Sequence, residues 1–139
     1  MEVKTASAEE TQKIGKKLAH SLKARDVVCL YGELGSGKTV LARGIAQGLG
    51  ITKRILSPTF VLLRRYPITQ GGKKIFLEHL DLYRIEDTSM LGLDEIFDSP
   101  GIVLVEWAEK LKDSLPKKRI DVKIKKLNQN ERQIEISHI

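Results

Sequence analysis

The sequence predicts a single α/β domain, residues 1–139, in which a mixed parallel and antiparallel sheet is flanked by helices. Three observations predict this class. An apolar strand, a glycine-rich loop and an amphipathic helix follow one another between residues 27 and 49. The short apolar segment Ile102–Val105 is typical of a central strand that is covered on both faces. Segments in which apolar and polar residues alternate, separated by turn residues, predict antiparallel hairpins at the edges of the sheet.

The first helix is predicted to begin after Ser7 and to end near Arg25. Ser7 and Glu10 have the spacing of a capping box, and apolar residues then recur at helical intervals. The first core strand is predicted for Val27–Tyr31. This strand contains Cys29, the only cysteine of the chain, which is therefore expected to pack as a small hydrophobic residue rather than form an internal disulfide.

The loop after this strand, Gly32–Thr39, fits the pattern G-x-x-x-x-G-K-[ST] at every fixed position. In such a loop, glycine backbones aim N–H groups at the phosphates of a nucleoside triphosphate, and the following helix adds its positive end. Lys38 is expected to reach the β- and γ-phosphates, and the Thr39 hydroxyl to bind Mg²⁺. The predicted nucleotide contacts are the residues of the loop and the one after it: Glu33, Leu34, Gly35, Ser36, Gly37, Lys38, Thr39 and Val40.

The middle of the chain predicts one hairpin and one helix. The helix after the loop is expected to stop at Gly48 and Gly50. Strands over Thr59–Tyr66 and Ile75–Tyr83 are predicted to pair antiparallel around the turn Gln70–Lys73. A further helix, with weak capping signals, is expected over Thr88–Phe97.

The last third predicts a strand, a helix and a second hairpin. After the strand Ile102–Val105, a helix is expected over Trp107–Leu115, where Pro116 ends it. The segments Ile120–Ile124 and Ile134–Ile136 alternate apolar and polar residues around an Asn-rich turn. They therefore predict a two-stranded hairpin with one exposed face.

Two carboxylates are candidates for the second anchor of Mg²⁺, which is usually an acidic residue at the end of an apolar strand beside the phosphate loop. Glu106 follows four apolar residues directly, and Asp81 ends a strand that alternates more. We interpret Glu106 as the residue near the metal. Asp81 is interpreted as its partner, which holds a metal-bound water or orients the attacking one, and the two roles are exchangeable.

Other polar residues have two interpretations each. The segment Ser57–Phe60 is either a turn or a switch in which a hydroxyl senses the γ-phosphate. His79 is interpreted as an ordinary strand histidine in preference to a proton carrier. Trp107 is either a core residue or a wall beside the nucleotide. Four arginines are candidates for stabilising the phosphoryl transition state: Arg43, Arg64, Arg65 and Arg84.

Charge and hydropathy restrict the function further. The formal net charge of +6 favours acidic partners, but aromatic residues make up only 5%, which argues against a stacking platform for single-stranded nucleic acid. The basic segment Lys117–Lys126 is interpreted as an exposed strand face, with contact to RNA or an acidic protein as the alternative. The sequence contains neither a signal peptide nor a membrane span, so a cytoplasmic protein without membrane contact is expected.

The chain resembles the TsaE family, the bacterial P-loop ATPases of tRNA threonylcarbamoyladenosine synthesis, along nearly its whole length. The segments that carry the resemblance occur in the order and spacing of the family. They are the phosphate loop, Ser57–Phe60, His79–Arg84, Gly92–Phe97 and Val105–Trp107. The loop is shared by many families, whereas the H-x-D-x-Y-R and V-E-W segments together are far more specific.

The resemblance implies an ATPase that uses ATP and Mg²⁺ and acts on the TsaD–TsaB pair. ATP binding would favour assembly of this complex and hydrolysis would reset it, with any tRNA contact being indirect. By resemblance, Lys38 and Thr39 bind phosphate and magnesium, and Thr59 lies in the switch-like segment. Asp81 and Glu106 serve hydrolysis and metal binding, so that Lys38, Asp81 and Glu106 are the expected catalytic residues.

Two alternatives come from other classes of protein. A small-metabolite kinase would share the loop and the acidic anchor, but it would need a lid and an arginine-rich substrate pocket. A nucleotide-dependent RNA-binding module is suggested by the basic C-terminal segment. The lack of an evident arginine finger predicts slow hydrolysis by the isolated protein.

Overall fold

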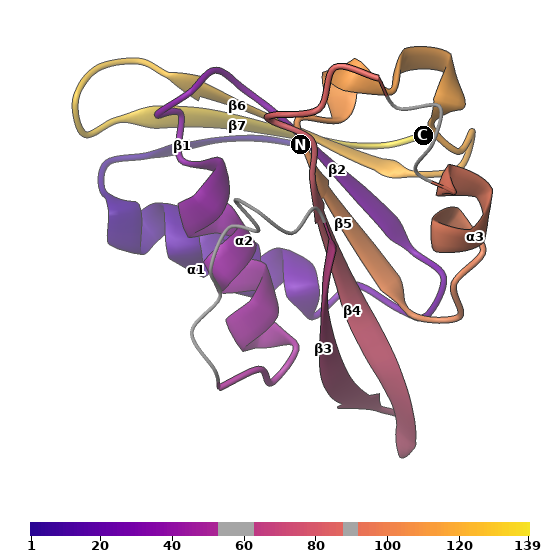
Figure 1. Ribbon diagram of the computed structural model, residues 1–139. Helices are drawn as coiled ribbons and strands as arrows, with labels where there is room; N and C mark the ends of the chain where they lie inside the picture. The colour runs from indigo at the N-terminus through magenta and orange to yellow at the C-terminus, as the bar shows by residue number, and fades with distance from the viewer. Residues whose placement is uncertain (53–62, 88–91) are drawn as a thin grey trace.

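The computed structural model of the protein describes residues 1–52, 63–87 and 92–139, shown in Figure 1. These residues form one seven-stranded sheet in the order β1-β7-β6-β2-β5-β4-β3. The strands are Glu2–Thr5 (β1), Val27–Tyr31 (β2), Leu63–Gln70 (β3), Lys73–Asp81 (β4), Ile102–Glu106 (β5), Ile120–Lys126 (β6) and Arg132–His138 (β7). The α-helices are Ala8–Ala19 (α1), Lys38–Gly48 (α2) and Leu93–Phe97 (α3), and two 3₁₀ turns span Ala108–Lys110 (η1) and Lys112–Ser114 (η2).

The sheet is parallel in its centre and antiparallel at both edges. Strands β6, β2, β5 and β4 run parallel, whereas β3 pairs antiparallel with β4, and β7 pairs antiparallel with β6 and β1. The predicted mixed sheet is therefore confirmed. Because the carboxyl ends of the parallel strands meet at one edge, the residues that follow β2, β4 and β5 lie close together there.

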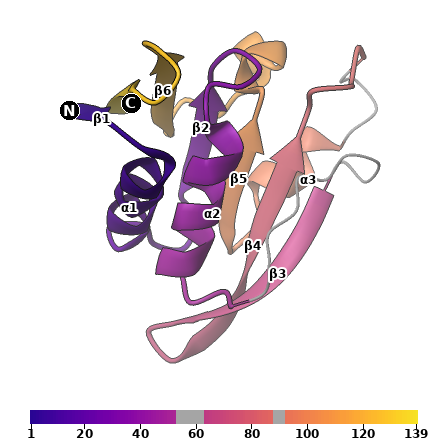
Figure 2. The same ribbon diagram turned by 90° about the vertical axis from the view of Figure 1, so that its left-hand side faces the viewer.

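Helices cover both faces of the sheet. Figures 1 and 2 show α1 and α2 side by side on one face, with α3 and the 3₁₀ turns on the other. All five residues of β5 are buried. Leu104 belongs to the core beneath α1 and α2, and Val105 belongs to the opposite core. The predicted central strand is thus covered on both faces. In the described ranges, the helices lack the length and apolarity that crossing a bilayer requires.

Both predicted hairpins are present. Gln70 lies opposite Lys73 at the turn between β3 and β4, and Ile124 lies opposite Ile134 in the pair of β6 and β7. Lysines of β6 project from an exposed face, as expected for this basic segment. Cys29 is fully buried in β2, and this burial raises the pKa of its thiol to about 12.

The N-terminal part differs from the prediction in two places. Strand β1 was not predicted, because only four residues form it and its order comes from pairing with β7, where Val3 lies opposite Ile134. Helix α1 ends at Ala19 rather than near Arg25. The N–H groups of Ser21 and Leu22 bond to carbonyls three residues back, and the chain turns at Arg25, whose φ is 75°.

The predicted helix over Trp107–Leu115 is replaced by η1 and η2. Trp107 and Lys112 have φ values of 61° and 45°, and such left-handed residues interrupt the hydrogen bonding of an α-helix. Helix α3 occupies the end of the helix predicted over Thr88–Phe97, whose first residues, 88–91, lie outside the described ranges. The segment Ser57–Phe60 also lies outside them.

Candidate nucleotide-binding site

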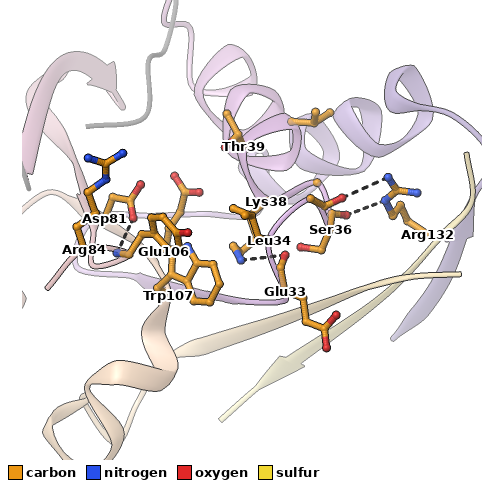
Figure 3. A pocket seen from close by; sticks show the side chains of 14 residues that line it. Glu33, Leu34, Ser36, Lys38, Thr39, Asp81, Arg84, Glu106, Trp107 and Arg132 are labelled. Atoms are coloured by element: carbon orange, nitrogen blue, oxygen red, sulfur yellow. Dashed lines mark hydrogen bonds between the residues drawn. The ribbon is translucent and has the colours of Figure 1, made fainter. Parts of the chain in front are cut away.

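A cavity of about 480 Å³ lies at the carboxyl edge of the parallel strands (Figure 3). Its lining includes all the loop residues that the sequence predicts as nucleotide contacts, Glu33 to Val40. Asp81 and Glu106 enter the same cavity from the ends of β4 and β5. The structure therefore brings together every predicted site residue in the described ranges. Thr59, the remaining one, lies outside them.

Backbone geometry explains the glycines of the loop. A Cβ at Gly32 would lie 2.6 Å from Ser36 Oγ and 2.7 Å from the carbonyl oxygen of Ile124, so the loop leaves no room for a side chain there. Gly37 has a φ of 108°, a conformation that favours glycine. The first turn of α2 contains no acidic residue, and its leading N–H groups lack acceptors within the helix. The cavity therefore borders on the positive end of α2.

The Lys38 ammonium lies at the wall of the cavity. Its Nζ donates hydrogen bonds to the carbonyl oxygens of Gly32 and Glu33, the latter at 3.3 Å, and lies 3.6 Å from the centroid of the Trp107 ring. Burial lowers the pKa of Lys38, against the opposing effect of nearby carboxylates, first among them Glu109. Since the present acceptors are neutral carbonyls, an anionic phosphate oxygen would be a stronger partner.

The two predicted carboxylates are neighbours. Asp81 lies directly opposite Glu106 in the pairing of β4 and β5. Asp81 Oδ1 accepts a hydrogen bond of 3.0 Å from the Tyr83 backbone, and Glu106 Oε2 lies 2.5 Å from His79 Nε2. Burial raises the pKa of Asp81, and the charge of Glu106 adds to the effect.

The oxygen atoms at this place fit a magnesium ion. Mg²⁺ prefers oxygen ligands, is bound through one or two carboxylates, and completes its shell with phosphate oxygens and water. The hydroxyl of Thr39 and the carboxylates of Asp81 and Glu106 line one cavity and supply such atoms. Among the described residues, no group of three or more His, Cys, Asp and Glu side chains could hold a metal ion by itself.

Replacing Asp81 with asparagine is expected to raise the melting temperature of the ligand-free protein at neutral pH. Because the folded protein holds the pKa of Asp81 above its ordinary value of 3.8, ionising this carboxyl disfavours the folded state at every pH above the folded pKa. The gain should shrink as the pH falls through that pKa and vanish below 3.8, where both states are protonated. Asp113→Asn, at an exposed position, is the matched control. A variant no more stable than wild type at neutral pH would contradict this account.

Arg132 also lines the cavity, although no motif of the sequence points to it. Its Nε donates a 2.8 Å hydrogen bond to the carbonyl oxygen of Ser36, and another of its nitrogens donates a 2.9 Å bond to that of Asn128. Figure 3 shows the side of this contact that faces the phosphate loop. Arg132 therefore ties the loop to the turn between β6 and β7. It lies 96 positions from Ser36, and only the placement of β6 beside β2 brings them together.

Aromatic residues complete the wall. The Tyr83 and Trp107 rings lie 5.0 Å apart at an interplanar angle of 36°, and both line the cavity. Trp107 combines its two interpretations, because it lines the cavity and also packs against the core on the α3 side of the sheet. Of the four candidate arginines, Arg84 lines the cavity, whereas Arg65 pairs with Glu78 at 3.1 Å.

This arrangement defines a P-loop protein of the α/β class: a phosphate-loop motif between a central parallel strand and its helix, facing carboxylates at the ends of two neighbouring strands. The profile of the family described as "Threonylcarbamoyl adenosine biosynthesis protein TsaE" matches residues 5–134. The chain belongs to the TsaE family.

Individual relatives agree with this assignment. A tRNA threonylcarbamoyladenosine biosynthesis protein TsaE of Bacillus subtilis is 43% identical over 132 residues, which cover 94% of this chain and 81% of the relative. A protein of the same name from a Nostoc species is 41% identical over 138 residues, covering 95% and 82%. The crystal structure of Bacillus subtilis YdiB superposes with a TM-score of 0.83 at 38% identity, covering 100% of this chain and 85% of that one. The resemblance inferred from the motifs is thus confirmed.

Proposed function

We propose that the protein is a Mg²⁺-dependent ATPase that acts as a nucleotide switch on the TsaD–TsaB pair in the synthesis of tRNA threonylcarbamoyladenosine. The observation that carries this proposal is that the loop residues Glu33–Thr39 line one cavity together with Asp81 and Glu106. Membership of the TsaE family supports the biosynthetic role. We also propose a cytoplasmic location, because the proposed partners act on tRNA.

Each residue of the site has a task in this proposal. The N–H groups of the loop and of the first turn of α2 bind the phosphates, and Lys38 binds the β- and γ-phosphate oxygens. Thr39 and Glu106 hold Mg²⁺, and Asp81 orients the attacking water. The ion neutralises the negative charge that develops on the transferred phosphoryl group.

Hydrolysis by the isolated protein is expected to be slow. An arginine at the γ-phosphate accelerates phosphoryl transfer by about a thousandfold or more in related chemistry. Among the candidate arginines, Arg84 lines the cavity. In this proposal a partner protein moves the Arg84 side chain into contact with the γ-phosphate. We therefore expect the TsaD–TsaB pair to raise the turnover of ATP.

The test is capture of the purified protein by immobilised TsaD–TsaB in Mg²⁺–ATP and in Mg²⁺–ADP. Capture should be strong with the triphosphate and weak with the diphosphate, because only the former supplies the γ-phosphate. The variant Asp81→Asn should be captured with ATP and released slowly, since it lacks the group that orients the water. Equal capture with ATP and with ADP would contradict the proposal that the bound nucleotide controls assembly with TsaD–TsaB.

A second assay separates this function from that of a small-metabolite kinase. Phosphate release is measured with ATP as the sole substrate, first alone and then with TsaD–TsaB. An ATPase releases phosphate without an acceptor, and the partner should increase the rate. A kinase would remain nearly idle in both conditions.

A further inference from the structure

Behind the wall of the cavity, two buried polar side chains contact each other. His79 Nε2 lies 2.5 Å from Glu106 Oε2, and the two side chains are only 1% and 3% exposed. His79 lies opposite Leu104, within the core beneath α1 and α2, and two residues before Asp81 on β4. Of the contacting pair, only Glu106 lines the cavity. The imidazole is therefore placed to act on the site through Glu106.

The contact restricts the orientation of the carboxylate. When Glu106 is ionised it can only accept, so His79 Nε2 carries the hydrogen and donates it to Oε2. The imidazole is itself held by strand β4 and by the core around it. With Oε2 engaged, Oε1 is the oxygen of Glu106 that remains for a ligand in the cavity.

Core packing alone does not account for an imidazole at this position. His79 Nδ1 is buried and has no hydrogen-bond partner among the described residues. Leaving such a group unpaired lowers stability, and leucine, a side chain of similar size, would avoid this cost. The polar contact that His79 does make is the one with Glu106.

We infer that His79 is a positioning residue for Glu106: it fixes the carboxylate so that Oε1 faces the magnesium ion of a bound nucleotide. This inference rests on the proposed function, because it assigns the second oxygen to Mg²⁺. Hydrogen-bond partners behind a metal ligand typically contribute about 10–100-fold to metal affinity or activity. The same range is expected for the contribution of His79.

The experiment is calorimetric titration of ATP with and without Mg²⁺. The dissociation constant without Mg²⁺ divided by that with Mg²⁺ measures how strongly the metal supports nucleotide binding. His79→Leu should reduce this ratio by about 10–100-fold and leave the affinity for metal-free ATP nearly unchanged. His79→Gln should recover part of the loss, because its amide N–H can donate to Glu106. In turnover assays, kcat at a fixed low Mg²⁺ concentration should fall more than KM for ATP rises.

A matched control and a double variant separate positioning from a structural effect. Leu77→Val alters a buried residue of the same strand, two positions away, and should leave the Mg²⁺ dependence unchanged. In a Glu106→Gln background, His79→Gln should add no further loss, because its effect passes through the carboxylate. Additive losses would overturn the inference. Because the double variant uses His79→Gln, it tests the positioning role even if His79→Leu does not fold.

A measurement without ligand completes the test. Proton NMR of the ligand-free protein should contain a downfield imidazole N–H resonance from the His79 contact, and Glu106→Gln should shift it upfield. If the wild type binds Mg²⁺–ATP and a folded His79→Leu variant shows the same Mg²⁺ dependence of ATP binding, this inference is overturned and the proposed function stays intact. A wild type that does not bind ATP would overturn both.

Discussion

Calorimetric titration of the variant Lys38→Met with Mg²⁺–ATP is expected to give an affinity about a hundredfold below that of wild type, because one or two charge-assisted hydrogen bonds to phosphate are lost. The ammonium donates hydrogen bonds to the loop carbonyls of Gly32 and Glu33, the latter at 3.3 Å, and lines the cavity. Its loss would leave the phosphates facing the carboxylates of Asp81 and Glu106 without this counter-charge. Methionine is chosen because it keeps a long unbranched apolar side chain at this position while removing the charge.

The matched control is Lys123→Met, which removes the same charge from an exposed position of β6. Its affinity should equal that of wild type at matched ionic strength. Trp107 provides a second readout, because it is the only tryptophan and Lys38 Nζ lies 3.6 Å from its ring centroid. Binding of phosphate by Lys38 should therefore change the fluorescence of wild type and not that of Lys38→Met. Equal ATP affinities of Lys38→Met and wild type would contradict the assignment of the loop.

The parts of the site that the sequence predicts are those built from neighbouring residues or from a simple rule of sheets. The loop Gly32–Thr39 is a continuous segment whose glycines, lysine and threonine are readable in order. Asp81 and Glu106 are far apart in sequence, but each ends a strand, and parallel strands place their carboxyl ends at one edge. Their meeting therefore follows from the predicted fold class.

The contacts that the sequence does not predict depend on the order of strands and on local backbone conformation. Arg132 reaches Ser36 because β6 lies beside β2 and β7 follows it, an order that hydrophobic patterns do not specify. The left-handed Trp107 replaces a predicted helix with 3₁₀ turns and brings its ring to the cavity. His79 has the pattern of an ordinary strand residue, and only the pairing of β4 with β5 places it beside Glu106.

Replacing Gly44 with alanine is expected to lower the free energy of unfolding by about 3 kcal/mol, within the range found for overpacked cores. A Cβ at this position would lie 2.1 Å from the carbonyl oxygen of Gln12 in α1, and a Cβ at Gly15 would lie 2.5 Å from that of Leu41 in α2. Alanine favours a helix over glycine by about 1 kcal/mol, but this gain is smaller than the cost of separating two backbones. The melting temperature should fall by about 10 °C.

Lys13→Ala, on the exposed side of α1, introduces alanine into the same helix pair without a clash and should change the melting temperature little. The variants Gly44→Ala and Gly15→Ala should not be additive, because once the helices have separated the second Cβ meets less resistance. The effect should extend to the site, since α2 begins at Lys38 and a shift of this helix moves its N-terminus away from β2. Gly44→Ala should therefore also weaken ATP binding at temperatures where it remains folded. If Gly44→Ala melts at the same temperature as wild type, the backbones of α1 and α2 are farther apart than the close contacts at Gly44 and Gly15 indicate.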